Sequence, residues 1–241
     1  MDLVEKRIGS VNRHPWELSR AASILKLLKR FGPDKKYADV GAGDVYFAER
    51  LSQQVNEPVY VVDIGYTENK RIGNLIQLMN IDDLPEQVDV VLLMDVIEHI
   101  DDVDSFLNSL LKKVKPGGQL VITVPAFQFL FSEHDVFLKH YRRYNLSLLH
   151  DTVKKQGLVI ETSFYFYTLL FFARCLVVAI EKLTKPAPAE GVGNWKYPEN
   201  HFLTKLIKGI LDLDYTINAA LGSIGIKFPG LSVCAICKKK S

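Results

Sequence analysis

Residues 36–51 read KYADVGAGDVYFAERL, and this order predicts a strand, a tight turn and a helix. Tyr37 to Val40 is short and mostly apolar, as expected for a buried parallel strand. Gly41 and Gly43 allow turn conformations and remove side chains that would keep a ligand away from the backbone. Asp44 is placed to cap the following helix, whose free amides favour polar or anionic ligand groups.

A second apolar strand follows about twenty residues later and ends in a carboxylate. It runs from Val59 to Val62, and Asp63 comes directly after it. An acid at this place can accept hydrogen bonds from two ribose hydroxyls, so the two segments predict a nucleoside site. The dinucleotide fingerprint requires a third glycine where this chain has Tyr46, which argues against NAD.

The segment from Asp39 to Gly43 resembles motif I of class I S-adenosylmethionine (SAM)-dependent methyltransferases. The last glycine of that motif is replaced by Val45 in this chain. The resemblance implies SAM as the cofactor and a Rossmann-like sheet. It also implies a set of cofactor-binding residues at these two strand ends, namely Asp39, Gly41, Ala42, Gly43, Asp63 and Ile64.

Length, charge and cysteine content favour a one-domain cytoplasmic enzyme over a nucleic-acid-binding or zinc-binding protein. The chain has 241 residues, enough for one elaborated domain with a large core. Its net charge of +2 shows no nucleic-acid footprint. Cys234 and Cys237 lie in an apolar run and are interpreted as packed core residues, without a second pair for zinc. Residues 1–13 lack the apolar run of a signal peptide, which predicts a cytoplasmic enzyme.

Strand-like and helix-like segments alternate along the chain. Further strands are expected at 74–78, 88–95, 119–125 and 158–163, with amphipathic helices between them. This alternation predicts an α/β, doubly wound sheet with the ligand at the carboxyl ends of its strands. In the methyltransferase fold that the chain resembles, a seventh, antiparallel strand is expected, and Leu231 to Cys237 fits it.

The resemblance also implies residues around the rest of the cofactor. Asp82 is expected to accept from the adenine amino group while Ile81 flanks the ring, with Asn80 or Asp83 as alternatives to Asp82. Backbone around Met94 and Asp95 is expected beside the methionine part of SAM.

Asp95, Glu98 and His99 share one helical face and offer a set of metal ligands. A similar Glu-x-x-Glu-His cluster is linked to a divalent metal in ubiquinone-biosynthesis O-methyltransferases. Metal-free methyltransferases carry the same letters, so no metal is predicted and these three residues remain the alternative.

The loop after the strand at 119–125 gathers two histidines, two acids and two arginines. His134 is the predicted general base, with Asp135 orienting it or binding substrate, and His140 is the second choice. Arg142 and Arg143 can grip a phosphate or carboxylate of the acceptor. The alternative is that Asp135, His140 and Arg143 only tie down the loop.

A leading helix, residues 14–32, opens with His14-Pro-Trp-Glu-x-x-Arg20. This opening, with the Ser-x-His-Asp and His-x-Arg-Arg-Tyr segments of the loop, resembles a bacterial methyltransferase group often found among surface-polysaccharide and lipid biosynthesis enzymes. The resemblance implies a helix that covers the cofactor or substrate. Trp16, Arg20, Arg142 and Tyr144 are the predicted substrate-binding residues, and Trp16 as a plain core anchor is the alternative.

Residues 164–230 form an insertion before the last strand. Its first run, 164–180, is seventeen residues long and carries Arg174, which is marginal for a membrane span. Two helices acting as a lid are expected. Segment 164–183 favours contact with a membrane surface or a homo-oligomer partner, and burial within the monomer is the alternative. The enzyme would then be peripheral at the inner membrane face.

The sequence thus predicts a single methyltransferase domain over 1–241. Its parts are the cover helix 14–32, the SAM-binding core 36–163, the insertion 164–230 and the last strand 231–238. The predicted reaction is methyl transfer to an oxygen or nitrogen of a small molecule that is a sugar, lipid-linked or phosphorylated. A SAM-binding regulatory or scaffold protein without turnover and an NAD-linked oxidoreductase are the alternatives.

Overall fold

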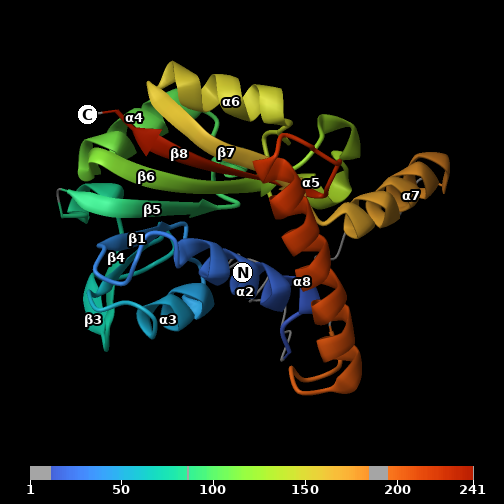
Figure 1. Ribbon diagram of the computed structural model, residues 1–241, viewed down its shortest axis with the longest axis horizontal. Coiled ribbons are helices and arrows are strands. Elements are labelled where there is room, and N and C mark those ends of the chain that lie inside the picture. Colours follow the sequence, from blue (N-terminus) through green and yellow to red (C-terminus); the bar gives the residue numbers. More distant parts are fainter. Residues whose placement is uncertain (1–11, 86, 185–194, 241) are drawn as a thin grey trace.

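The protein is described by a computed structural model over residues 12–85, 87–184 and 195–240. An eight-stranded mixed sheet crosses the molecule in the order β3-β4-β2-β1-β5-β6-β8-β7 (Figure 1). β1 pairs in parallel with β2 and β5, and β6 continues the parallel set beside β5. β8 is antiparallel to both of its neighbours, β6 and β7. The predicted α/β Rossmann-like class and its antiparallel last strand are confirmed.

β1 and β2, at the middle of the parallel set, are short and almost wholly buried, because helices cover both faces of the sheet. The bounds are β1 Tyr37–Val40, β2 Val59–Val62, β3 Lys70–Ile72, β4 Leu75–Leu78, β5 Val88–Met94, β6 Val114–Pro125, β7 Leu158–Phe166 and β8 Ser232–Lys239.

Two hydrophobic cores lie on opposite faces of the sheet. One packs under α4 (Val103–Lys113) and α6 (Leu146–Lys155), and the other under α2 (Pro15–Leu28), α3 (Tyr46–Ser52) and α8 (Phe202–Ser223). Figure 1 shows α6 and α8 on opposite sides of the strands. The remaining helices are α5 Glu133–Phe137, α7 Thr168–Thr184 and the 3-10 turns η1 Ile81–Asp83, η2 Ile97–His99 and η3 Gln128–Leu130.

The sheet has one strand more than the seven that were predicted. The extra strand, β3, pairs antiparallel with β4 at the edge of the sheet, in a segment where no strand was predicted. It is only three residues long, and Lys70, Arg71 and Ile72 are all exposed. A short, charged edge strand blunts sheet-to-sheet association, and it leaves no hydrophobic alternation to detect in the sequence.

The first three residues of the predicted insertion, Phe164 to Phe166, form the end of β7, and the helices described within it are α7 and α8. Asp214 of α8 caps the start of α7, because its carboxylate accepts from the backbone amides of Thr168 at 3.0 Å and Leu169 at 2.8 Å. Asp214 is buried, so this contact fixes where α7 leaves the body of the protein. From there α7 projects outward, and only Phe171 and Val178 are buried along it (Figure 1).

No helix within the described parts of the chain is both long enough and apolar enough to cross a bilayer. Cys234 and Cys237 are buried in β8, as predicted, and burial raises the pKa of each thiol to about 12. Both are therefore inert core residues at neutral pH.

Candidate functional site

The glycine turn closes against the end of β2. The amide of Gly41 donates to the carbonyl of Val62 at 2.7 Å, and φ at Gly41 is +77°. A Cβ at Gly41 would lie 2.5 Å from Cγ2 of Val96, so both the conformation and the space require glycine. Val45, which replaces the last glycine of the motif, itself adopts a left-handed conformation with φ 59°. The turn thus keeps the shape that a glycine would give it.

Asp63 stands where an acid after β2 was expected. One carboxylate oxygen, Oδ2, accepts from the amide of Gly43 at 2.9 Å, and Oδ1 accepts from the amide of Gly65 at 2.8 Å. A carboxylate has about four lone-pair positions, so two remain for a ligand such as a pair of hydroxyls. The hydroxyl of Tyr66 donates to the carbonyl of Gly43 at 3.0 Å and braces the same turn.

The leading helix lies over this turn. Arg20 of α2 forms an ion pair with Asp95 after β5, and Arg13 forms another with Asp44. A small pocket between α2 and the turn is lined by Arg13, Glu17, Arg20, Ala21, Gly41, Ala42, Asp44, Tyr46, Phe47 and Met94. It therefore joins the predicted cofactor residues Gly41, Ala42 and Met94 to Arg20.

Asp39 lies beneath the turn, 1% exposed. Its two carboxylate oxygens have no hydrogen-bond partner among the described residues. Burial raises its pKa to about 7, against the attraction of Arg20. A buried acid that stays partly protonated at neutral pH is the kind of group found near ligand sites.

The residues predicted around the adenine lie apart from that pocket. Ile81 and Asp82 are in η1, after β4, with Ile81 half-buried and Asp82 exposed. Ile64 is 95% exposed and does not line that pocket. Asp95 has φ 55° and accepts from the hydroxyl of Thr123 at 3.2 Å.

The loop after β6 is organised by Asp135, which is fully buried. Its Oδ1 atom bonds Nδ1 of His140 at 2.8 Å and accepts from Nε of Arg143 at 2.7 Å. Its Oδ2 atom accepts from the amide of Ser132 at 3.0 Å. Burial alone would raise the pKa of Asp135, but the bonds from His140 and Arg143 outweigh it and hold the pKa at about 2. The structure thus pairs Asp135 with His140, not with His134 as predicted.

His140 is carried to the end of β5 by this loop. The amide of Tyr141 donates to the carbonyl of Glu98 at 2.8 Å, and the rings of His99 and His140 lie edge to face, 4.6 Å apart. Glu98 is fully buried, its carboxylate has no hydrogen-bond partner among the described residues, and burial raises its pKa to about 8. His140 therefore lies beside the His99 imidazole and close to the buried carboxyl group of Glu98.

Potential metal ligands meet here in a different set from the one considered in the sequence. Glu98, His99 and His140 each offer a ligand atom, and these atoms lie within 4.8 Å of one another. Asp95 is instead held by Arg20. One carboxylate and two imidazoles suit zinc, so the donor set fits a divalent ion, while the absence of a metal remains a prediction.

His134 lies on the other side of Asp135, in α5. Burial lowers its pKa, and Arg174 of α7 adds to that effect while Asp135 opposes it. Arg174 also donates to the hydroxyl of Ser132, so α7 touches the loop directly. His134 is therefore uncharged at neutral pH.

The other predicted substrate residues are mostly engaged by the protein itself. Arg142 donates to the carbonyl of Asp101 at 2.9 Å, and Arg143 is buried against Asp135. Tyr144 is 1% exposed, and its hydroxyl donates to the carbonyl of Ile97 at 3.4 Å. Trp16 is half-buried and lies under the guanidinium of Arg20, 4.9 Å from the ring centre.

Six of the ten residues that line the pocket, Arg13 among them, were not predicted as site residues, and neither was Tyr66, which braces the glycine turn. Arg13 lies in the segment 1–13, to which no site role was given, yet its guanidinium lies 3.7 Å above the ring of Tyr46 as well as beside Asp44. Tyr66 lies between the predicted strands 59–62 and 74–78, where no site residue was predicted after Ile64. The only local signal for Arg13 was a positive charge just before the start of α2. No local signal marked Tyr66.

Comparison with known proteins agrees with this geometry. The methyltransferase-domain family matches residues 16–176 of the chain. A methyltransferase structure from Mesorhizobium loti has a TM-score of 0.53 at 10% identity and covers 92% of this chain and all of its own. Phosphoethanolamine N-methyltransferase 2 of Haemonchus contortus, in complex with S-adenosyl-L-methionine, has a TM-score of 0.52 at 19% identity, covering 94% of this chain and 53% of that one. These likenesses support the fold.

Sequence relatives cover a smaller part. A ubiquinone biosynthesis O-methyltransferase of Pseudomonas fluorescens is 30% identical over 100 residues, 36% of this chain and 42% of the relative. A mitochondrial one of Dictyostelium discoideum is 35% identical over 111 residues, 44% of this chain and 33% of the relative. The chain thus matches less than half the length of these curated relatives. Since the family match spans well over half of the chain, it belongs to the methyltransferase-domain family, the SAM-dependent enzymes of Rossmann-like fold, as predicted.

Proposed function

We propose that this chain is an O-methyltransferase that takes the methyl group from SAM and uses His140, oriented by Asp135, as its general base. The observation that carries the proposal is the 2.8 Å contact between Nδ1 of His140 and the buried Asp135 carboxylate. That contact holds the proton of a neutral imidazole on Nδ1 and leaves Nε2 to accept one. The dyad lies beside Glu98 and the carboxyl end of β5, where the fold binds its ligands.

Methyl transfer of this kind is an in-line displacement. The acceptor oxygen forms a bond to the methyl carbon while the carbon–sulfur bond breaks, and the sulfonium becomes a neutral thioether. The proton of the acceptor hydroxyl goes to Nε2 of His140. Holding the two reactants at about 3–3.5 Å provides much of the rate, and a positioned base adds about 10²–10⁴-fold.

The acceptor is proposed to be a hydroxyl of a lipid-linked small molecule. Arg142 and Arg143 are bound within the protein, which disfavours a phosphorylated acceptor held by them. Phe129 in η3 and Phe172 in α7 are 54% and 60% exposed beside the loop, as suits an apolar acceptor. The O-methyltransferase names of the sequence relatives support oxygen, and the bacterial lipid and polysaccharide group that the chain resembles is the proposed subgroup.

Residues 164–183 are proposed to bring the enzyme to the inner face of the membrane from the cytoplasm. Their exposed apolar side chains, Leu169, Phe172, Leu176, Ile180 and Leu183, make α7 a surface that suits contact with lipid.

The two histidines provide a matched test. We expect His140→Gln to lower kcat by 10²–10⁴-fold and His134→Gln to leave it within a few fold. Turnover is measured with methyl-labelled SAM against a panel of phenols, sugars and extracted lipids, and SAM affinity by calorimetry. Both variants are expected to bind SAM as the wild type does. If His134→Gln is the inactive variant, the base has been assigned to the wrong ring. A wild type that binds SAM but methylates nothing in the panel would favour the alternative, a SAM-binding regulatory or scaffold protein without turnover.

We also propose that turnover needs no metal. Dialysis against a chelator is expected to leave the rate unchanged. Recovery of a lost rate on adding Mg²⁺ or Zn²⁺, together with loss of that recovery in His99→Gln, would instead place an ion among Glu98, His99 and His140.

A further inference from the structure

The outer side of α8 carries an uninterrupted apolar seam. We define this seam as Leu203, Leu206, Ile210, Leu213, Ile217, Ala220 and Ile224, the last of which caps the end of the helix. Their spacings alternate as three and four residues without exception. Alternation of this kind is the a/d pattern of a coiled coil. Isoleucine fills three of the four a positions, 210, 217 and 224, and leucine fills two of the three d positions, 206 and 213.

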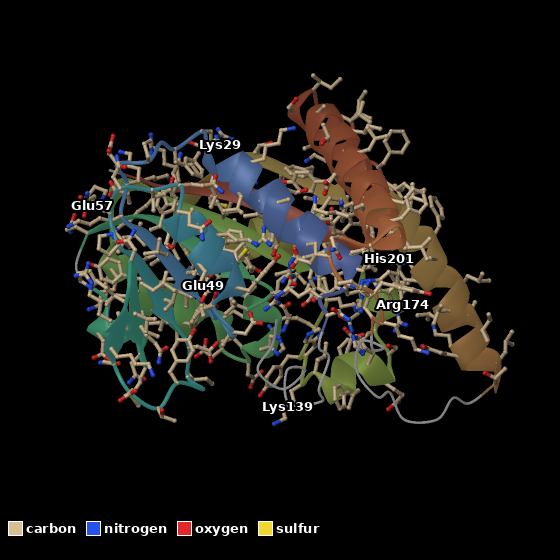
Figure 2. All side chains as sticks on the ribbon, turned by 90° about the horizontal axis from the view of Figure 1, so that it is seen from below. Lys29, Glu49, Glu57, Lys139, Arg174 and His201 are labelled. Carbon is tan, nitrogen blue, oxygen red and sulfur yellow. The ribbon has the colours of Figure 1, made fainter. Side chains whose placement is uncertain are left out.

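The seam faces solvent. Its large side chains are between 38% and 71% exposed, with Leu213 at 61%. The opposite side of the same helix is buried against the protein by Thr204, Leu211, Tyr215 and Asn218. Figure 2 shows α8 beside α2, with the side chains of its far side standing clear of other elements. Within residues 12–85, 87–184 and 195–240, the seam is therefore not buried against another element.

The apolar pattern of the seam suits packing against another helix better than contact with a lipid surface. A helix that lies on a membrane has a broad apolar face bordered by lysine and arginine. The seam has no such border, because the positions beside it are Phe202, Gly209 and Thr216 on one side and Ile207, Asp214 and Leu221 on the other, with no lysine or arginine among them. Isoleucine at a with leucine at d is the combination that favours a pair of helices.

A second copy of this chain is the partner that the seam fits. In a two-fold contact the same patch packs on itself, which requires a surface without like charges facing each other. No seam residue is charged, and the neighbouring positions Phe202, Gly209 and Thr216 are uncharged as well. The 22 residues of α8 span about 33 Å, enough for three heptads. Leu213, near the middle, would meet its copy at the two-fold axis.

We propose that two copies of this protein pair through the α8 seam. The prediction from the sequence placed such a contact at 164–183, and the seam places it on the following helix. The proposal does not depend on the reaction or on the acceptor.

The mass in solution tests it, by analytical ultracentrifugation of the full chain. The wild type is expected at twice the chain mass of 27.3 kDa. The double variant Leu213→Glu, Ile217→Glu is expected at 27.3 kDa, a twofold loss of mass. Leu176→Glu is the matched control, because this α7 residue is 64% exposed but lies off the seam, and it is expected to remain a dimer.

Two further measurements decide among the outcomes. Circular dichroism and thermal unfolding show that the double variant is folded, and a mixture of Ile217→Glu with Ile217→Lys is expected to restore the dimer that each lacks alone. A monomeric wild type overturns the proposal. The proposal is also overturned if the wild type is a monomer that floats with anionic vesicles while the double variant does not. That result would show that the seam binds lipid. A dimer that persists in the double variant but is lost in Leu176→Glu overturns the proposal too.

Discussion

At the scale of single residues, the glycine turn depends on Gly41. Gly41 is required twice over, by a φ of +77° and by the 2.5 Å distance from an added Cβ to Val96. Gly32, at the end of the leading helix, has a φ of +89° but open space around an added Cβ. Substituting alanine at Gly32 therefore tests the cost of the left-handed conformation alone. The same substitution at Gly41 adds the cost of the contact with Val96.

We predict that Gly41→Ala lowers the free energy of unfolding by about 2–4 kcal/mol, the sum of a strained φ and an overpacked contact. Gly32→Ala should cost only the first part, about 1–2 kcal/mol. Urea unfolding of both variants measures this, with Gly41→Ala, Val96→Ala as the relief of the clash. Equal losses in the two single variants would show that Val96 moves aside.

Asp39 gives a prediction on pH. Because burial raises its pKa from 3.8 to about 7, the folded state holds a proton that the unfolded state has already released. The stability from Asp39 is complete below pH 4 and falls as the pH rises through 7. Asp39→Asn removes this titration, so the difference in thermal midpoint between variant and wild type should shift in favour of the variant from pH 4 to pH 8. A difference that is independent of pH would mean that the carboxyl group is already ionised in the fold.

At the scale of elements, the join between α7 and α8 is the contact that most needs testing. The carboxylate of Asp214 accepts from two amides in the first turn of α7, whereas Asp212 on the same helix pairs with Lys208 near the surface. Asp214→Ala is expected to cost about 1–2 kcal/mol, as for the loss of a helix cap, and to speed amide hydrogen exchange along α7. Asp212→Ala should change neither, within about 0.5 kcal/mol. If amide hydrogens of α7 exchange as slowly in Asp214→Ala as in the wild type, the packing of Phe171 and Val178 alone holds the helix in place.

The sequence predicts elements well where the signal is local. The strands of the parallel set, the glycine turn and the acid after β2 were found because each is a short pattern with a clear boundary. β3 was missed because Lys70 and Arg71 have no apolar alternation. The pairing of Asp135 with His140 was missed for another reason. Sequence places Asp135 next to His134, but in the short helix α5 their side chains diverge, and the turn after it brings His140 back to the carboxylate.

At the scale of the whole molecule, the proposed site has two halves. The proposed cofactor half lies at the strand ends of a fold shared with many methyltransferases, and the proposed acceptor half lies in the loop around Asp135 and His140. α2 closes the first through Arg20 and Asp95, and α7 touches the second through Arg174 and Ser132. Binding of the cofactor and turnover should therefore be separable by substitution.

Calorimetry with SAM is the most direct test of the central claim, that a nucleoside is held between the glycine turn and Asp63. The wild type is expected to bind SAM and its demethylated product but not NAD. Asp63→Ala should weaken SAM binding at least tenfold, because about 1.4 kcal/mol or more is lost with the hydrogen bonds to ribose. The exposed Asp82→Ala variant should weaken it less. Failure of the wild type to bind SAM, or equal affinity in Asp63→Ala, would contradict the account.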